Sequence, residues 1–386
     1  MQILNFKLTF LTPAFLGDAA QNGRWRTPPI KHELRAWWRV AYAASKQFNF
    51  AASEMRKAEA LLFGHAWLED DAFECDGRRV TTAARKSAIR LRLMRWDVGT
   101  LKSWEGLEKG TVHHPETERT NYQVGPHAYL GFGPLDGRGG TNLAKSDAAI
   151  KDEESARLSI AAACEAQSDA WRLIREALAL MNLFGTLGGR SRNGWGSYAL
   201  DPTDGTPAHS VDLLPLRYWK DALDLDWPHA IGKDEKGAPL IWQTEPCDDW
   251  KGVMKTLAEL KIRLRTQKGA FEFVLNREHR DEEVVDKRTG ERTGIAHGRP
   301  QDRHWIAYPV TNHKVKTWER HTLRLPNQLR FKVRKTNDGR LVGVIFHMPH
   351  LPPPAFSPNR RVIESVWQKV HRFLDGQGQK LSRISA

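Results

Sequence analysis

The sequence is poor in cysteine, and its three cysteines, Cys75, Cys164 and Cys247, lie far apart. Three separated thiols cannot form a paired zinc knuckle or a disulfide framework. Long apolar runs are also missing, because no stretch approaches the roughly 18 apolar residues of a membrane-spanning helix. The first residues lack the basic segment and small-residue cleavage site of a signal peptide. We therefore expect a cytoplasmic protein that does not contact a membrane.

Acidic residues are outnumbered, and the excess of basic residues is unevenly distributed. The chain of 386 residues has a net charge of +13. Residues 251–386 hold 28 Lys and Arg against 13 Asp and Glu, whereas residues 201–250 hold 4 against 11. An acidic stretch between two basic parts indicates polyanion-binding domains joined by a segment that does not touch the polyanion. The alternative is that the surplus cations only keep a large protein soluble.

The hydrophobic pattern of residues 1–200 predicts the order strand, helix, strand, strand, helix, strand. Leu4, Phe6, Leu8 and Phe10 alternate with polar residues, which is typical of a half-buried strand. This order is the split β-α-β unit of ferredoxin-like domains. An irregular insertion over 97–150 is expected to contain one short strand. The predicted helices cover 30–44, 54–63 and 165–184, and the later strands cover 89–93, 129–132, 156–162 and 195–200.

The second half of the chain repeats this kind of pattern with more decoration. Residues 201–247 are acidic and rich in Pro, Asp and Gly, which predicts a linker with short local structure, and 276–303 read as a mobile loop. The fold class is therefore predicted to be α+β, with tandem ferredoxin-like (RRM-like) domains over 1–200 and 248–386 and with loop insertions. Helices are predicted at 249–264 and 362–374, and strands at 305–310, 322–325, 329–333 and 341–347.

The first predicted helix carries a basic ridge beside its apolar face. Its cations are spaced four residues apart, which aligns their side chains. Guanidinium groups bind phosphates bidentately, and an indole ring stacks a base at about 1–3 kcal/mol. The alternative is a solvated basic face whose tryptophans are buried in the core. The candidate RNA ligands of this region are Arg24, Arg26, Lys31, Arg35, Trp38 and Arg39.

A second candidate is the glycine-rich loop 187–197 (LGGRSRNGWGS). Glycines let a backbone approach a phosphodiester closely, and their N–H groups can form an anion-binding nest. The loop follows a helix C-terminus, where the dipole disfavours anions, so arginines would have to attract the phosphate. A plain connection with tight turns is the alternative. The candidate RNA ligands here are Gly188, Gly189, Arg190, Arg192 and Trp195.

These runs resemble the RAMP subunits of type III-B CRISPR effector complexes, the Cmr complexes. Residues 11–17 (LTPAFLG), 26–30 (RTPPI) and 34–39 (LRAWWR) are similar to the first segments of the capping RAMP subunit, and 59–64 (EALLFG) resemble its next block. Residues 183–196 resemble the glycine-rich loop of RAMP proteins generally. The resemblance covers residues 1–200 in order and spacing, and over 201–386 it is weak.

The resemblance implies tandem ferredoxin-like RAMP domains at the end of a filament of Cmr subunits. The partners would be guide CRISPR RNA near its 3′ end, paired target RNA and the other RAMP subunits. The protein would capture target RNA in antiviral defence without cutting it, so no catalytic residue, metal or cofactor is expected. The seven candidate cations would hold phosphates, while Trp38 and Trp195 would stack bases.

Three alternatives remain open at this point. Asp18 follows the first strand, where backbone-forming RAMP subunits carry an acidic residue that cuts target RNA with a divalent metal. His32 on the basic helix could instead be the base of a guide-processing ribonuclease. The third is a protein scaffold that touches RNA only incidentally. The other histidines lack ligand spacing, and no His-Glu-x-x-His motif is present.

Overall fold

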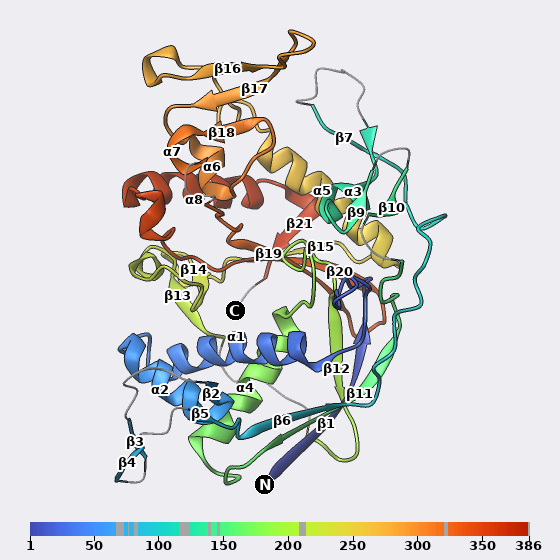
Figure 1. Ribbon diagram of the computed structural model, residues 1–386, viewed down its shortest axis with the longest axis vertical. Coiled ribbons are helices and arrows are strands. Elements are labelled where there is room, and N and C mark those ends of the chain that lie inside the picture. The colour runs from blue at the N-terminus through green and yellow to red at the C-terminus, as the bar shows by residue number, and fades with distance from the viewer. Residues whose placement is uncertain are drawn as a thin grey trace.

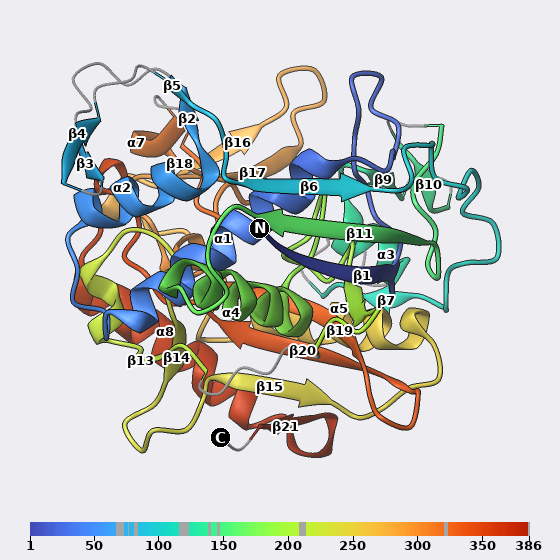
Figure 2. The ribbon, with the colours of Figure 1, turned by 90° about the horizontal axis from the view of Figure 1, so that it is seen from below.

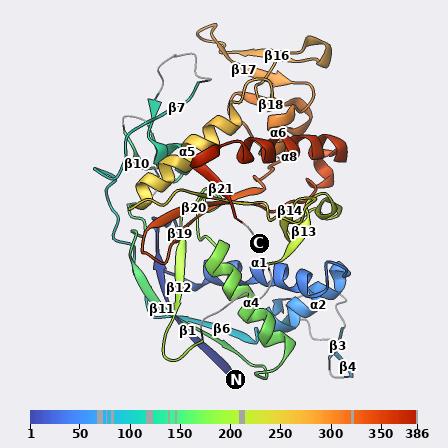
Figure 3. The ribbon, with the colours of Figure 1, turned by 180° about the vertical axis from the view of Figure 1, so that it is seen from behind.

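The structure is a computed structural model that describes residues 1–66, 73–75, 77–80, 84–115, 123–137, 140–144, 147–207, 214–319 and 323–384. Its fold is α+β, with two four-stranded antiparallel sheets and the helices that pack on them (Figure 1). The layers run in the order first sheet, helix pair, second sheet, second helix pair (Figure 3). No described helix combines the length and apolar character that crossing a bilayer requires.

The first sheet has the strand order β12-β1-β11-β6, and every neighbouring pair is antiparallel. Leu4, Phe6, Leu8 and Phe10 are buried because alternate side chains of a strand point to one face. Two helices cover that face, α1 (Thr27–Ser45) and α4 (Asp169–Phe184). Among the described elements, no helix covers the opposite face (Figure 2). The strands are β1 (Gln2–Phe10), β6 (Ile89–Leu93), β11 (Ser155–Ala162) and β12 (Tyr198–Pro202).

The second sheet has the strand order β19-β20-β15-β21 and is antiparallel throughout. Its central strand β20 is buried on both faces. Val344 and Phe346 pack with α1 and α4, whereas Ile345 packs with the second helix pair. The strands are β15 (Ile241–Thr244), β19 (Leu329–Lys335), β20 (Leu341–His347) and β21 (Leu381–Arg383), and the helices are α5 (Trp250–Arg265) and α8 (Arg360–Asp375).

The two sheets share one topology. When the strands of each sheet are numbered in chain order, both sheets have the spatial order 4-1-3-2. In each, a long helix follows the first strand, α1 in one case and α5 in the other, and another long helix, α4 or α8, lies between the last two strands. Two different parts of the chain thus form sheets with the same strand order.

Smaller elements surround both sheets. Those in the first half are α2 (Ala52–Phe63), β2 (His65–Ala66), β3 (Phe73–Cys75), β4 (Arg78–Val80), β5 (Ala84–Arg85), β7 (Val112–His113), β8 (Gln123–Val124), α3 (Pro126–Gly131), β9 (Leu135–Asp136) and β10 (Asn142–Leu143). Those in the second half are β13 (Leu216–Tyr218), η1 (Asp221–Asp224), β14 (Ile231–Lys233), η2 (Arg277–His279), β16 (Glu282–Val285), β17 (Arg292–His297), α6 (Asp302–Ile306), β18 (His313–Val315), α7 (Lys316–Glu319), η3 (Pro354–Phe356) and η4 (Gly378–Lys380).

A buried lysine ties the two halves together. Lys332 of β19 donates to the carbonyl oxygens of Gly185 at 2.8 Å, Tyr198 at 2.9 Å and Met181 at 3.3 Å, which lie at the end of α4 and the start of β12. The phenol ring of Tyr198 lies 4.5 Å from the ammonium group. These carbonyls and the ring compensate the charge where no water reaches it. The contact fixes the glycine-rich loop against the second sheet.

The five predicted helices are confirmed, as are the strands predicted near 89–93, 156–162, 329–333 and 341–347. Helix ends follow local signals. The Ser168 hydroxyl accepts from Trp171 N–H at the start of α4, and the Asp249 carboxylate accepts from Gly252 N–H at the start of α5. The last strand predicted in the first half, 195–200, is shifted to Tyr198–Pro202.

Three predictions of secondary structure are wrong. Residues 129–132 lie mainly in α3, whose first residue is Pro126, and 305–310 begin in α6 rather than in a strand. The predicted loop 276–303 contains the β16–β17 hairpin. The predicted linker 201–247 contains short elements, of which β15 belongs to the second sheet. The predicted strand 322–325 lies partly outside the described residues. Its last residue, Leu325, forms an isolated bridge with Tyr308.

Candidate nucleic-acid interface

The basic ridge of α1 is partly neutralised by one carboxylate. Arg39 donates from Nε to Glu59 Oε2 at 2.8 Å, and its Nη2 lies 2.7 Å from Oε1. Arg35 also donates to Glu59, which is only 4% exposed. Burial raises the pKa of Glu59, but the hydrogen bonds from Arg39 and Arg35 outweigh it and hold the pKa below its usual value. The three side chains together therefore carry a single positive charge.

The remaining cations near α1 also have local roles. Lys31 Nζ lies 3.4 Å from the carbonyl oxygen of Phe63, and burial followed by the neighbouring Arg35 lowers the pKa of Lys31. Arg24 donates to Asp18 Oδ2 at 2.9 Å and to the carbonyl oxygen of Trp96 at 3.0 Å. The Nε atom of Arg26 is buried and finds no partner among the described residues. This region is a modest anion site at most.

The structure argues against the predicted stacking roles of Trp38 and Trp195. Trp38 is 2% exposed and packs against Tyr42 and Phe63, with ring centroids 5.2 and 5.7 Å away. Trp195 is fully buried, 5.6 Å from Trp104 by ring centroids. A base stacks only on a ring face that it can reach. Both indoles are instead parts of the hydrophobic core.

The glycine-rich loop packs closely against the segment after β1. A side chain on Gly188, whose φ is +94°, would place its Cβ 2.7 Å from the carbonyl oxygen of Phe15. The N–H of Gly189 donates to that oxygen at 2.9 Å, so it is not free for an anion. The glycines thus serve backbone packing, and the cationic side chains of the loop are those of Arg190 and Arg192.

Arg190 and Arg192 line a cleft of about 970 Å³ between the loop, α3, α5 and the segment around α6. Further cations reach it from distant parts of the sequence. Among the described lining residues, Asp136 is the one carboxylate. The cationic lining residues are Arg190, Arg192, Lys261, Arg265, Arg303 and Arg324.

The cations of this cleft are crowded. Burial and then Arg324 lower the pKa of Arg190, and burial likewise lowers the pKa of Arg192. Burial, Arg265 and Arg190 lower the pKa of Lys261 to about 7. Desolvation and like-charge repulsion both disfavour the charged forms, so an anion placed in the cleft would stabilise them.

The sequence predicted two of these six cations, Arg190 and Arg192, and did not indicate the other four. Lys261 and Arg265 lie four residues apart on α5, a spacing that places them on one face of the helix. The basic excess of residues 251–386 was a further signal. Arg303 and Arg324 reach the cleft only through the fold, and no local pattern connects them with the glycine-rich loop.

The carboxylate of Asp18 is engaged by its own loop. Its Oδ1 accepts the N–H groups of Ala20 at 2.9 Å and Asn22 at 3.0 Å, and its Oδ2 accepts from Arg24. The Arg24 hydrogen bond is the main cause that lowers the pKa of Asp18. His32 is exposed on the first turns of α1. In the described part of the chain, no three His, Cys, Asp or Glu side chains are arranged to hold a metal ion.

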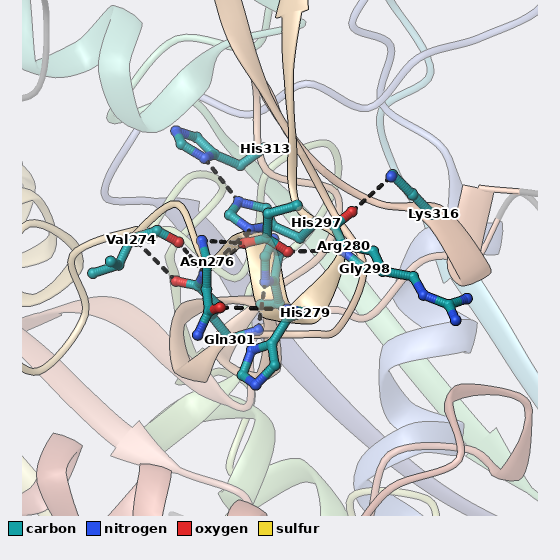
Figure 4. Close-up of polar contacts among 11 residues, drawn as sticks. Val274, Asn276, His279, Arg280, His297, Gly298, Gln301, His313 and Lys316 are labelled. Atoms are coloured by element: carbon teal, nitrogen blue, oxygen red, sulfur yellow. Dashed lines mark hydrogen bonds and ion pairs between the residues drawn. The ribbon is translucent and has the colours of Figure 1, made fainter.

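Histidines distant in the sequence meet in the lobe that contains β16, β17 and β18 (Figure 4). The buried His297 places Nδ1 3.0 Å from Asp281 Oδ2 and Nε2 3.2 Å from His313 Nδ1. Burial raises the pKa of Asp281, but hydrogen bonds from Gly298, His297 and Asn276 outweigh it and hold the pKa below its usual value. This network fastens the lobe, and the spacing of the histidines gave no sign of it.

No protein-family model matches the sequence, and no curated protein matches it. Among solved structures, the apo crystal structure of Cmr1 from Pyrococcus furiosus matches at 16% identity and a TM-score of 0.43, over 96% of this chain and 97% of that one. A chain of the type III-B Cmr-beta complex bound to cognate target RNA matches at 12% identity and 0.44, over 95% and 99%.

A second Cmr-beta structure, bound to cognate target RNA and AMPPnP in the presence of ssDNA, matches at 12% identity and a TM-score of 0.45, over 96% and 99%. These are likenesses in the path of the backbone and transfer no binding role to any residue of this chain.

Proposed function

We propose that this chain is a non-catalytic, RNA-binding RAMP subunit of a type III-B CRISPR effector complex and that RNA binds in the basic cleft. The observation that carries the proposal is the convergence of six cations around the glycine-rich loop, opposed by the single described carboxylate of Asp136. A nucleic-acid backbone supplies the repeated negative charge that such a cluster attracts.

The volume of the cleft, about 970 Å³, and the spread of its cations favour a polymer over a free phosphate. Arg190 and Arg192 project from the loop, while Lys261 and Arg265 come from α5 on another side. Cations on several sides of a cleft of this volume can contact successive phosphates of one strand. These contacts position RNA without reading its sequence, which base pairing with a guide would supply.

Accessible aromatic rings in the cleft replace the buried tryptophans as candidates for stacking. Phe132, at the end of α3, is 64% exposed and lines the cleft. Tyr129, which is partly exposed, lines it as well, whereas the lining Tyr308 is only 7% exposed. Aromatic rings interleaved with cations are the composition of single-strand binding grooves, because every base has a face that can stack.

The strand order, the sequence resemblance and the contacts of Asp18 support the proposed domains, partners and absence of cleavage. The shared 4-1-3-2 strand order supports ferredoxin-like domains in both halves. The first would end with β12 at Pro202, and the second would begin before β15 at Ile241, ahead of the predicted start at 248. Guide CRISPR RNA, target RNA and neighbouring RAMP subunits in the cytoplasm are the partners that the sequence resemblance implies. The engagement of Asp18 by Ala20, Asn22 and Arg24 supports capture of target RNA without cleavage.

Binding of a labelled single-stranded RNA of about 40 nucleotides across a salt series tests the cleft. The Arg265→Ala/Arg324→Ala variant should weaken binding about tenfold or more and lower the salt slope by about two, because each phosphate contact releases about one counterion. Arg361→Ala/Arg372→Ala, on the exposed part of α8, is the matched control and should bind as wild type. Equal affinity and slope in both variants would refute the cleft as the RNA site.

The same RNA incubated with Mg²⁺ tests the catalytic alternatives. A capture subunit leaves the RNA intact in wild type, Asp18→Ala and His32→Ala. Cutting that needs Mg²⁺ and disappears in Asp18→Ala would make this a target-cleaving RAMP nuclease. Cutting without Mg²⁺ that disappears in His32→Ala would make it a guide-processing ribonuclease.

A further inference from the structure

The outer face of the first sheet is left open by the fold. The helices α1 and α4 occupy the inner face, and the outer face is turned to solvent (Figures 1 and 3). Because side chains alternate along each strand, one set of residues from four strands shares this surface. We define the open face by these residues: Ile3, Asn5, Lys7, Arg90, Arg92, Arg157, Ser159 and Asp201.

Three cations of the open face are unengaged. Lys7, Arg90 and Arg92 are exposed, and none has a side-chain hydrogen bond or ion pair with a described residue. Arg157 pairs with Asp204 beyond the edge strand β12, and Asp201 lies opposite Lys7 on that strand. The acidic groups therefore lie on the β12 side, and β6 and β11 carry cations alone.

The centre of the open face is polar and flat. Arg92 is paired across the sheet with Ser159, which is paired in turn with Asn5. The Ser159 hydroxyl lies 2.6 Å from Asn5 Oδ1. Neighbouring strands lie about 4.8 Å apart, so the cations of β6 and β1 are separated by about two strand spacings. Phosphates of an extended strand can bridge such a separation, and the hydroxyl and amide can meet sugars between them.

An exposed tryptophan lies just beyond the end of β6. Met94, whose N–H still donates to the carbonyl oxygen of Arg157 on β11, and Trp96 follow Leu93 and are 56% and 57% exposed. The indole Nε1 of Trp96 donates to the carbonyl oxygen of Leu93 at 2.9 Å, which fixes the orientation of the ring. A ring that is both held and exposed is suited to stack a base, in contrast to the buried Trp38.

We propose that the open face of the first sheet is a second site for single-stranded RNA, with Lys7, Arg90 and Arg92 on phosphates and Trp96 on a base. Stacking rings and cations on a four-stranded sheet are one of the general ways in which proteins hold unpaired RNA. A protein partner is less suited, because the centre of the face is polar and its charges are of one sign on β6 and β11. The site is separate from the cleft, so either proposal can fail alone.

Two measurements on the full chain test the open face. Photo-crosslinking with a 4-thiouridine-labelled single-stranded RNA, followed by peptide mapping, should place crosslinks at Trp96 or on β6. In a salt series, Arg90→Ala/Arg92→Ala should weaken binding about tenfold and lower the salt slope by about two. Arg90→Lys/Arg92→Lys should recover most of the binding, and Arg361→Ala/Arg372→Ala should not change it.

The cleft variant separates the two sites. Arg265→Ala/Arg324→Ala should keep the crosslink at Trp96 even where total affinity falls. Wild-type affinity and slope in Arg90→Ala/Arg92→Ala, with no crosslink on β6, would overturn the open-face site and leave the cleft standing. Impaired association with other subunits at unchanged RNA affinity would also overturn it, because the face would then be a protein interface.

Discussion

At the scale of single residues, pairing decides which cations are free for a ligand. Glu59 forms ion pairs with Arg35 and Arg39, whereas Arg190 and Arg192 line a cleft with one described carboxylate. An arginine that already satisfies a buried carboxylate has its charge partly compensated and fewer N–H donors left for a phosphate, whereas a crowded arginine gains from the phosphate. The candidate sites are therefore marked by arginines such as Arg190 and Arg192, and not by the most regularly spaced cations.

The Glu59 network gives a prediction at this scale. Arg39→Ala should destabilise the protein by about 1–2 kcal/mol, because it removes two hydrogen bonds from a buried carboxylate while Arg35 still compensates part of the charge. Urea unfolding measures this, with Lys57→Ala on the exposed face of α2 as the control at under about 0.5 kcal/mol. Equal losses in the two variants would show that the carboxylate does not depend on Arg39.

At the scale of elements, local periodicity predicted what local interactions determine. Helices α1, α4, α5 and α8 have apolar stripes and terminal signals within their own sequence. Short aromatic segments do not. The run 305–310 has the β propensity of a strand, but α6 is held by a capping box between Gln301 and His304. The four-residue β15 is defined by its pairing with β20 and β21, which no pattern in 201–247 reveals.

The candidate site was predictable to the same extent. Arg190 and Arg192 could be predicted because they lie in a run rich in glycine. The other cations of the cleft lie on elements distant in the sequence, so they could not be connected with that run. The sequence left open whether Trp38 is buried or exposed, since an indole on the border of an apolar stripe packs inward or outward according to its neighbours in the fold. It gave no sign that Trp195, in the glycine-rich loop, is buried. Tertiary contacts alone decide such positions.

The glycine-rich loop gives the prediction at this scale. Gly196 has a φ of +63°, and a Cβ there would overlap the carbonyl oxygen of Leu187. Gly196→Ala should therefore lower stability by about 2 kcal/mol or more and weaken RNA binding through a displaced loop. Gly205 also has a positive φ, but nothing lies near its Cβ position, so Gly205→Ala should cost only about 1 kcal/mol and leave binding unchanged. If Gly196→Ala and Gly205→Ala had similar effects on stability and RNA binding, the glycine-rich loop would not shape the cleft.

At the scale of the whole molecule, the alternation of sheet and helix layers buries many histidines. Burial lowers the pKa of His127, His229 and His350 to about 4 and that of His304 and His371 to about 3. In the unfolded chain these groups titrate near 6.5. The unfolded chain therefore binds more protons between about pH 3 and pH 6.5.

The free energy of unfolding is therefore expected to have its full value above about pH 7. It should fall as the pH drops through 6.5 toward the pKa values that the histidines have in the folded protein. At pH 5 each such histidine lowers the free energy of unfolding by about 2 kcal/mol, so the melting temperature should fall by about 10 °C or more between pH 7.5 and pH 5. His371→Gln removes one titrating group that is 7% exposed and should reduce this fall, whereas His32→Gln, at an exposed position, should not. A melting temperature that stays constant down to pH 5 in all three proteins would mean that the buried histidines accept protons without unfolding, through water that reaches the layers.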